Sequence, residues 1–261
     1  MPTDFVEAAR EFRKELGFTS QERLKEFYKA SDIDRPVNLG YIEELNQRLS
    51  EIVSKIDSVV HKSVKANNLE KFINQKLIKP HSLIIKNNLL PLMTNQGRPP
   101  ENVYYNWMRG HLFSEYFKTA ITKIFDIGDQ EIANVGEDNF GNIETFKRAA
   151  TADLEIESSK GIIRIEMQSG FTGINDIKQH KWMEAVRQKN TGTKSLVMHI
   201  DLFNGAAAFV RLDNIAENDL QWITRQQMEG QTVYNIDANR FTWQITDLPP
   251  SLDQIEIDWS K

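Results

Sequence analysis

Acidic side chains alternate with apolar ones in two neighbouring segments, and this pattern can build a metal site. In residues 151–157, and again from Arg164 to Gln168 in the segment 162–168, every second side chain is polar or charged. Because side chains alternate between the two faces of a strand, each segment predicts a strand with one buried and one polar face. Residues 158–161, Ser-Ser-Lys-Gly, are typical of a hairpin turn. An antiparallel hairpin would bring Asp153 close to Glu166 on the neighbouring strand.

Two carboxylates held side by side repel each other unless a cation lies between them. Mg²⁺ prefers carboxylate oxygens, so Asp153 and Glu166 predict a Mg²⁺ site that Mn²⁺ can also occupy. The backbone carbonyl of Met167 is expected as a further ligand, and Gln168, which also falls opposite Asp153, can position a water molecule. Gly170 and the later Gly173 would leave space for another backbone or a phosphate. Charged residues on the outer face of a half-exposed sheet are also common without catalysis, so a structural role stays open.

Other chemistries lack their residues. The chain of 261 residues has no cysteine, which excludes disulfides, thiolate zinc sites and cysteine nucleophiles. No HExxH, GxSxG, P-loop or dinucleotide-binding motif is present. The net charge is −5, but residues 55–98 carry eight basic side chains against two acidic ones. This segment predicts a surface that faces DNA, although a solvated helix would show the same composition.

The first hundred residues are predicted to be helical. Apolar residues between Ile42 and Val60 recur at spacings of three and four, as on one face of a helix over about residues 41–66. This stripe would pack within its own domain, with a dimer interface as the alternative. Turn-forming residues at 94–102 divide the chain into a helical N-terminal region, 1–98, for DNA contact or dimerisation, and a core, 99–261.

The core is predicted to contain helices and a sheet. A helix over residues 103–117 carries Glu115, and a second helix is expected over 174–190. Besides the hairpin, strands are expected at 195–202, 206–212, 232–236 and 240–245, the last two as a pair completing the sheet. This order predicts an α/β or α+β fold, with a central mixed β-sheet flanked by helices.

The run Ala152-Asp153-Leu154-Glu155-Ile156, followed by Ile165-Glu166-Met167-Gln168, resembles the active-site core of the PD-(D/E)xK nuclease superfamily. The resemblance covers about residues 103–212 and includes the helix before the hairpin and the helix after it, with Lys178, His180 and Lys181. It implies a restriction-endonuclease-like fold in which Asp153 and Glu166 hold the metal and Glu115 completes the acidic cluster. The implied reaction is phosphodiester hydrolysis that leaves 5′-phosphate and 3′-hydroxyl ends.

The chain departs from the family pattern at two positions. Ala152 stands where the motif has proline, and Gln168 stands where the family usually has lysine. A few type II restriction endonucleases are similar in carrying Glu-x-Gln. Arg164, Lys160 or Lys178 would then supply the missing positive charge. An inactive relative of the fold is the alternative.

The resemblance implies a type II restriction endonuclease that acts on double-stranded DNA as a homodimer, because a palindromic target matches two-fold symmetry. With no transmembrane helix or signal peptide expected, the protein would act in the cytoplasm of a prokaryote, in a restriction–modification system. The alternatives are a nuclease of the same fold in repair or mobile elements, and a non-catalytic DNA-binding or protein-interaction module. The side chains expected to contact DNA are Asn95, Gln96, Arg98, Thr172, Asn175, Lys178, Lys181, Gln226 and Gln227.

Overall fold

The computed structural model describes residues 3–29, 32–33, 36–94, 98–135, 152–225 and 230–259. The helices are α1 (Thr3–Glu15), α2 (Gln21–Lys29), α3 (Leu39–Val59), α4 (Leu69–Ile73), a π-helical turn (Asn74–Ile78), α5 (Lys79–Lys86), α6 (Pro100–Tyr116), α7 (Lys118–Phe125) and α8 (Gln179–Lys189). The strands are β1 (Ile132–Asn134), β2 (Leu154–Ser158), β3 (Gly161–Gly170), β4 (Asp176–Lys178), β5 (Lys194–Asp201), β6 (Ala206–Arg211), β7 (Trp222–Arg225), β8 (Gln231–Asn235) and β9 (Phe241–Gln244).

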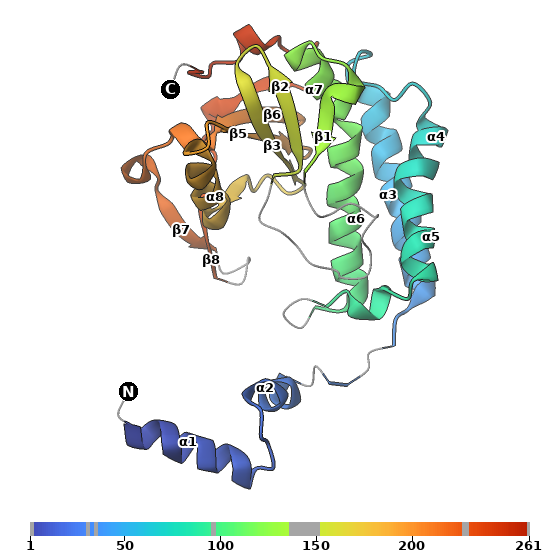
Figure 1. Cartoon of the computed structure of the whole chain (residues 1–261). Helices are drawn as coiled ribbons and strands as arrows, with labels where there is room; N and C mark the ends of the chain where they lie inside the picture. The colour runs from blue at the N-terminus through green and yellow to red at the C-terminus, as the bar shows by residue number, and fades with distance from the viewer. Residues whose placement is uncertain are drawn as a thin grey trace.

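The main sheet has six strands in the order β1-β2-β3-β5-β6-β9. In this sheet β3 and β5 are parallel, whereas every other pair of neighbouring strands is antiparallel. Parallel neighbours need a crossover connection, and here the crossover contains β4 and α8. Helices lie against the sheet in Figure 1, so the predicted mixed α/β fold with a helical N-terminal region is confirmed.

The prediction that strands near 232–236 and 240–245 form a pair was wrong. The first of these, β8, pairs with β4 and β7 in a separate three-stranded sheet, whereas β9 pairs with β6 in the main sheet. Their buried residues explain the separation, since Trp243 of β9 enters the main core and Tyr234 of β8 packs against a second, smaller core. The helix expected from residue 174 begins only at Gln179, because β4 precedes it.

The main core lies on one face of the six-stranded sheet and joins the two regions that the sequence divides at residue 98. Ile42, Leu49 and Val53 of α3 are fully buried together with Met108 of α6 and Ile165 of β3. The apolar stripe of α3 therefore packs within its own chain, as the first interpretation of that stripe proposed. It is not available as the dimer contact that was the alternative.

The opposite face of the sheet carries the smaller core. Ile177 of β4 and Ala185 of α8 pack there against Val197 of β5 and Val210 of β6. Helix α8 thus covers the sheet on the face away from α3 and α6 (Figure 1). The polar side chains of the hairpin also point to this face.

Helices α1 and α2 lie apart from the other elements in Figure 1. Phe5 and Phe12 of α1 and Phe27 of α2 are each more than half exposed. In the described part of the chain, no helix combines the length and the apolar character needed to cross a membrane.

Candidate active site

The hairpin of β2 and β3 has the predicted alternation of faces. Leu154 pairs with Ile165, and Ile156 pairs with Ile163, and all four side chains are buried in the main core. The turn falls at 158–161 as predicted, with Gly161 at φ 93°, a conformation that favours glycine. Continuing the register one residue beyond Leu154 brings position 153 opposite position 166.

Asp153 lies immediately before β2 rather than within it. Its Oδ2 accepts a hydrogen bond from the backbone N–H of Met167 at 2.7 Å, and its carbonyl accepts one from Val135 at 3.1 Å. In a strand the N–H and C=O of one residue point to the same side. The carbonyl of Met167 therefore also points to the edge of β3 where Asp153 lies.

Glu166 forms an ion pair with Lys181 of α8, with 2.8 Å between Oε2 and Nζ. The side chains are only 14% and 16% exposed, so water screens this pair less than it screens a surface pair. Lys181 lies in the first turn of α8, where the helix dipole disfavours a cation. The carboxylate of Glu166 offsets that cost and holds the lysine at the sheet. Lys181, which was predicted to contact DNA, pairs with Glu166 in this structure.

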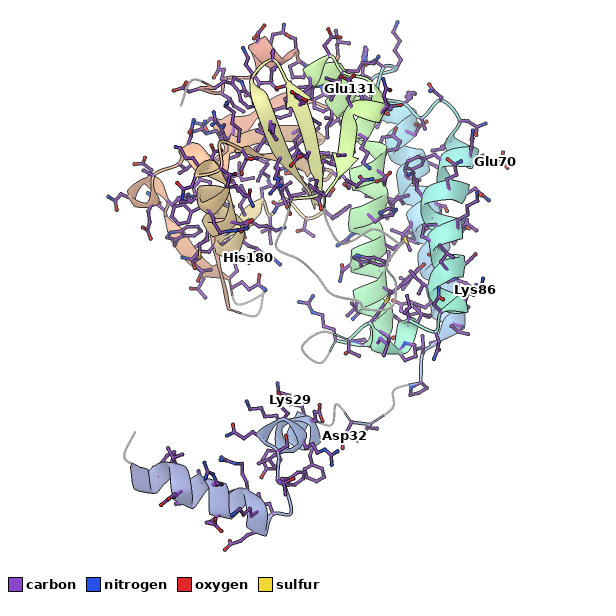
Figure 2. The ribbon with its side chains drawn as sticks, in the orientation of Figure 1. Lys29, Asp32, Glu70, Lys86, Glu131 and His180 are labelled. Atoms are coloured by element: carbon purple, nitrogen blue, oxygen red, sulfur yellow. The ribbon has the colours of Figure 1, made fainter. Side chains whose placement is uncertain are left out.

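A cleft opens between the sheet and α8 at this pair. Its lining residues are Ala152, Arg164, Glu166, Lys181, Glu184, Ala185, Gln188, Ser195, Leu196 and Leu212. The N-terminal end of α8 is positive, since Lys178 precedes the helix and Lys181, which lines the cleft, lies in its first turn. His180, labelled in Figure 2, lies in the same turn. The pKa of His180 is lowered by burial and then by the charges of Lys181 and Lys178. This charge pattern suits an anionic ligand such as a phosphate.

Gln168 shares the face of Glu166 two residues farther along β3, and it lies beside His199 of β5 in the parallel register. The Gln168 amide is 3.3 Å from Nδ1 of His199, and Nε2 of that ring is 2.7 Å from Oδ1 of Asn175. Sequence reasoning missed His199. Recognising β3 and β5 as parallel strands of similar length would have brought the two residues together.

Asn175 was predicted to contact DNA, and that prediction was wrong. The residue is 9% exposed, and its amide is bonded to His199 on one side and to Oδ2 of Asp201 at 2.8 Å on the other. Gly170 was expected to leave room for a phosphate or another backbone. A Cβ at Gly170 would instead lie 2.8 Å from Oδ1 of Asn175 and 3.1 Å from Nε2 of His199. The glycine makes room for these side chains.

Glu115 does not complete the acidic cluster. Its carboxylate binds Lys118, and it also binds Lys76 with 2.6 Å between Oε2 and Nζ. Burial raises the pKa of Glu115, but the hydrogen bonds and charges of Lys118 and Lys76 outweigh burial and lower it overall. No group of three or more acidic or histidine side chains within the described residues is arranged to hold a metal ion.

Arg164, Lys160 and Lys178 were expected to supply the positive charge that a lysine at position 168 would bring. In the structure they have other partners or positions than Lys181. Arg164 pairs with Glu155 across the hairpin at 2.8 Å, and Lys160 reaches the exposed Asp253 at 3.4 Å. Lys160 also lies at the opposite end of β3 from Gln168, roughly 26 Å away at the rise of an extended strand. Lys178 precedes α8 as its N-terminal cap residue. Lys181 contacts Glu166 directly, with 2.8 Å between Nζ and Oε2.

The remaining predicted DNA contacts are scattered. Asn95, Gln96, Gln226 and Gln227 lie outside the described residues. Arg98 precedes α6, and Thr172 is exposed in the loop after β3. The described part of the basic segment, residues 55–94, contains helices on the main-core side of the sheet, where Figure 2 labels Lys86. Glu166 instead faces α8.

The oxygen donors on β3 beside the first residue of β2 fit a hard divalent cation. Two carboxylates, of Asp153 and Glu166, and the carbonyl of Met167 supply only oxygen, which is the preferred ligand of Mg²⁺ and Mn²⁺. The hydrogen bond from Met167 to Asp153 holds the Asp153 carboxylate against β3 at this point. Asp153, Glu166 and Met167 are therefore the residues that would hold such an ion.

Two buried histidines make the stability of the fold depend on pH. Burial lowers the pKa of His199 and of His111 to about 4, against an ordinary value of 6.5. As the pH falls, these histidines therefore take up protons at a higher pH in the unfolded chain than in the folded chain. Their contribution to the free energy of unfolding is complete above about pH 6.5 and is lost as the pH drops toward 4. We expect the free energy of unfolding to fall by roughly 2 kcal/mol per histidine between about pH 7 and pH 5.

Urea unfolding at several pH values in this range measures that loss. The variant His111→Gln is expected to lose about half as much unfolding free energy over this pH range as the natural chain, because only His199 then contributes. A free energy of unfolding that stays constant from about pH 7 to pH 5 would contradict the burial of neutral imidazoles.

In sequence comparisons, no protein-family model matches this chain, and no curated protein shows significant similarity to it.

Proposed function

We propose that this protein is a Mg²⁺-dependent deoxyribonuclease of the type II restriction endonuclease class. The observation that carries the proposal is the hydrogen bond from the Met167 backbone to Asp153, next to the Glu166–Lys181 pair. Asp153, Glu166 and the Met167 carbonyl offer oxygen ligands for a metal beside Lys181, at the point on β3 where β2 begins. The positive end of α8 adjoins them and suits a phosphodiester.

Each residue has a role in the hydrolysis. Asp153, Glu166 and the Met167 carbonyl hold the ion, which when bound acidifies water and offsets phosphate charge. Lys181 supplies the positive charge that a lysine at position 168 would otherwise bring, and it stabilises the charge that grows on the phosphate oxygens. Gln168 orients the attacking water. The water oxygen bonds to phosphorus, and the bond to the 3′ oxygen breaks, so that this oxygen leaves with a proton.

Incubation of the purified chain with phage DNA and Mg²⁺ tests the proposal. Discrete fragments are expected, and a chelator should abolish them. Ligation of the fragments reports on the ends, because a ligase joins a 5′-phosphate to a 3′-hydroxyl. A smear or structure-dependent nicking would point to the repair or mobile-element class, and no cleavage with Mg²⁺ or Mn²⁺ would contradict a nuclease.

The proposal includes a palindromic DNA target and therefore a homodimer, in the cytoplasm of a prokaryote that carries the matching methylation system. Sedimentation of the chain with and without DNA tests the dimer separately. Sequencing the fragment ends identifies the recognition sequence and the cut position.

A further inference from the structure

A chain of hydrogen-bonded polar side chains runs through the α8 face of the sheet and ends at Gln168. From Asp201 it passes to Asn175 at 2.8 Å, then to His199 at 2.7 Å, and then to Gln168 at 3.3 Å. His199 and Asp201 are almost completely buried, at 3% and 1% exposed. Because each group in such a chain must donate to the next or accept from it, one fixed end determines the direction of the others.

Asp201 is the fixed end. Its Oδ1 accepts from the backbone N–H groups of Phe203 and Asn204 at 3.0 and 3.1 Å, and its Oδ2 accepts from Nδ2 of Asn204 at 2.7 Å. Burial raises the pKa of Asp201, but its hydrogen bonds, led by those from Asn175 and Asn204, lower it overall. The ionised carboxylate only accepts, so Asn175 must donate with its NH₂ group. The carbonyl oxygen of Asn175 then faces His199.

This arrangement selects one tautomer of His199. The proton must lie on Nε2, because Nε2 faces the carbonyl oxygen of Asn175. The ring is buried and neutral near pH 7, so Nδ1 carries a lone pair and needs a donor. In the structure Oε1 of Gln168 faces Nδ1 at 3.3 Å, and an oxygen cannot donate to that lone pair. Turning the Gln168 amide by 180° brings its NH₂ group to Nδ1 and supplies the donor. The two ends of a glutamine amide have the same shape, so the hydrogen-bond partner decides between them.

The carbonyl oxygen of Gln168 then points away from β5. In the sheet, β3 lies between β5 and β2, so the side away from β5 is the side of Asp153. Glu166 lies two residues earlier on the same face of β3, roughly 7 Å away at the rise of a strand. Gly170 preserves the network, because a Cβ there would strike both Asn175 and His199.

We propose that His199, held by Asn175 and Asp201, is a positioning residue that turns the carbonyl oxygen of Gln168 toward the attacking water. This inference rests on the proposed nuclease function. An oxygen at this position accepts a hydrogen bond from the water and so directs a lone pair of the water toward phosphorus. A lysine at the same position could only donate, so the two residue types act in opposite senses, and Lys181 provides the positive charge separately.

A double-mutant cycle on cleavage tests the positioning role. His199→Phe is expected to lower kcat about 10- to 30-fold with KM for DNA unchanged, because only the orientation of Gln168 is lost. In a Gln168→Ala background the same change is expected to cost less than about twofold. His199→Gln, which can both donate and accept, should recover part of the rate. A His199→Phe penalty that persists in full without Gln168 would overturn the proposal, since it would show a purely structural role.

The direction of the network is tested without any activity. Long-range nitrogen–proton NMR spectra of the chain with ¹⁵N-labelled histidine distinguish the two imidazole tautomers. The Nε2–H form of His199 is expected in the natural chain, and an Nδ1–H form would overturn the proposal even if the protein cleaves DNA. If the proposed nuclease function fails, the Nε2–H signal still reports the network.

Gln168→Glu provides a second variant in case His199→Phe does not fold. A carboxylate cannot donate to Nδ1, so that nitrogen is expected to acquire a proton shared with the carboxylate. The appearance of an Nδ1–H signal supports a donating Gln168. An unchanged Nε2–H spectrum with no proton on Nδ1 contradicts it.

Discussion

Replacing Glu166 by glutamine is expected to lower the rate of Mg²⁺-dependent DNA cleavage about 10³-fold or more. The change removes one of the two carboxylates proposed to hold the metal and keeps the size of the side chain. A loss of 10³-fold corresponds to about 4 kcal/mol of transition-state stabilisation, the scale of a charged ligand in a poorly screened site. Asp153→Asn is expected to have a similar effect, because its amide oxygen can still accept from Met167 while the charge is lost.

Initial rates of plasmid cleavage measure these losses, and a gel-shift assay in Ca²⁺ should show that DNA still binds. Glu157→Gln is the matched control, since Glu157 belongs to the same hairpin but is exposed. It should cleave like the natural chain. Full activity in either Glu166→Gln or Asp153→Asn would refute the assignment of the site.

Replacing Lys181 by methionine is expected to lower kcat about 10²- to 10³-fold. Methionine keeps most of the length of the side chain and removes the charge that lies 2.8 Å from Glu166. The positive charge is proposed to stabilise the phosphate in the transition state, so KM for DNA should change much less than kcat. Lys181→Arg should retain more activity than Lys181→Met, because it keeps the charge but not the compact ammonium group.

Lys189→Met is the control for helix α8. Lys189 ends the same helix and donates to the carbonyl of Asp213 at 3.0 Å, away from Glu166. Its cleavage rate should match that of the natural chain. If Lys181→Met cleaves at the natural rate, the proposed role of Lys181 in stabilising the phosphate is contradicted.

Gln168→Lys, which introduces the lysine usual in the PD-(D/E)xK superfamily, is expected to change the metal preference or the rate of cleavage with the fold intact.

The hairpin and the sheet could be predicted because local patterns determine them. Alternation across a strand depends only on neighbouring residues, so Leu154, Ile156, Ile163 and Ile165 were assigned correctly to the buried face. The turn at Gly161 follows from the same local chemistry. Strands of three or four residues, such as β1 and β7, are too short to show a clear alternation, and they form because neighbouring strands pair with them.

The partners of the polar residues could not be predicted, because they come from distant parts of the chain. Glu115 and Lys181 illustrate this point. Position before the hairpin suggested Glu115 for the acidic cluster, yet Lys76, from the helical region, lies beside it. Lys181 was predicted to contact DNA, and the structure pairs it with Glu166, because the crossover between the parallel strands lays α8 over that residue.

The sequence by itself determined the α/β class, the two faces of the hairpin and the oxygen-bearing residues at its open end, because periodicity and turn chemistry act over a few residues. Only the tertiary structure decided that Asp153 bonds to the Met167 backbone, that Lys181 pairs with Glu166 and that His199 faces Gln168. Those contacts depend on strand order and helix packing, which arise from burying the apolar faces of the whole chain at once.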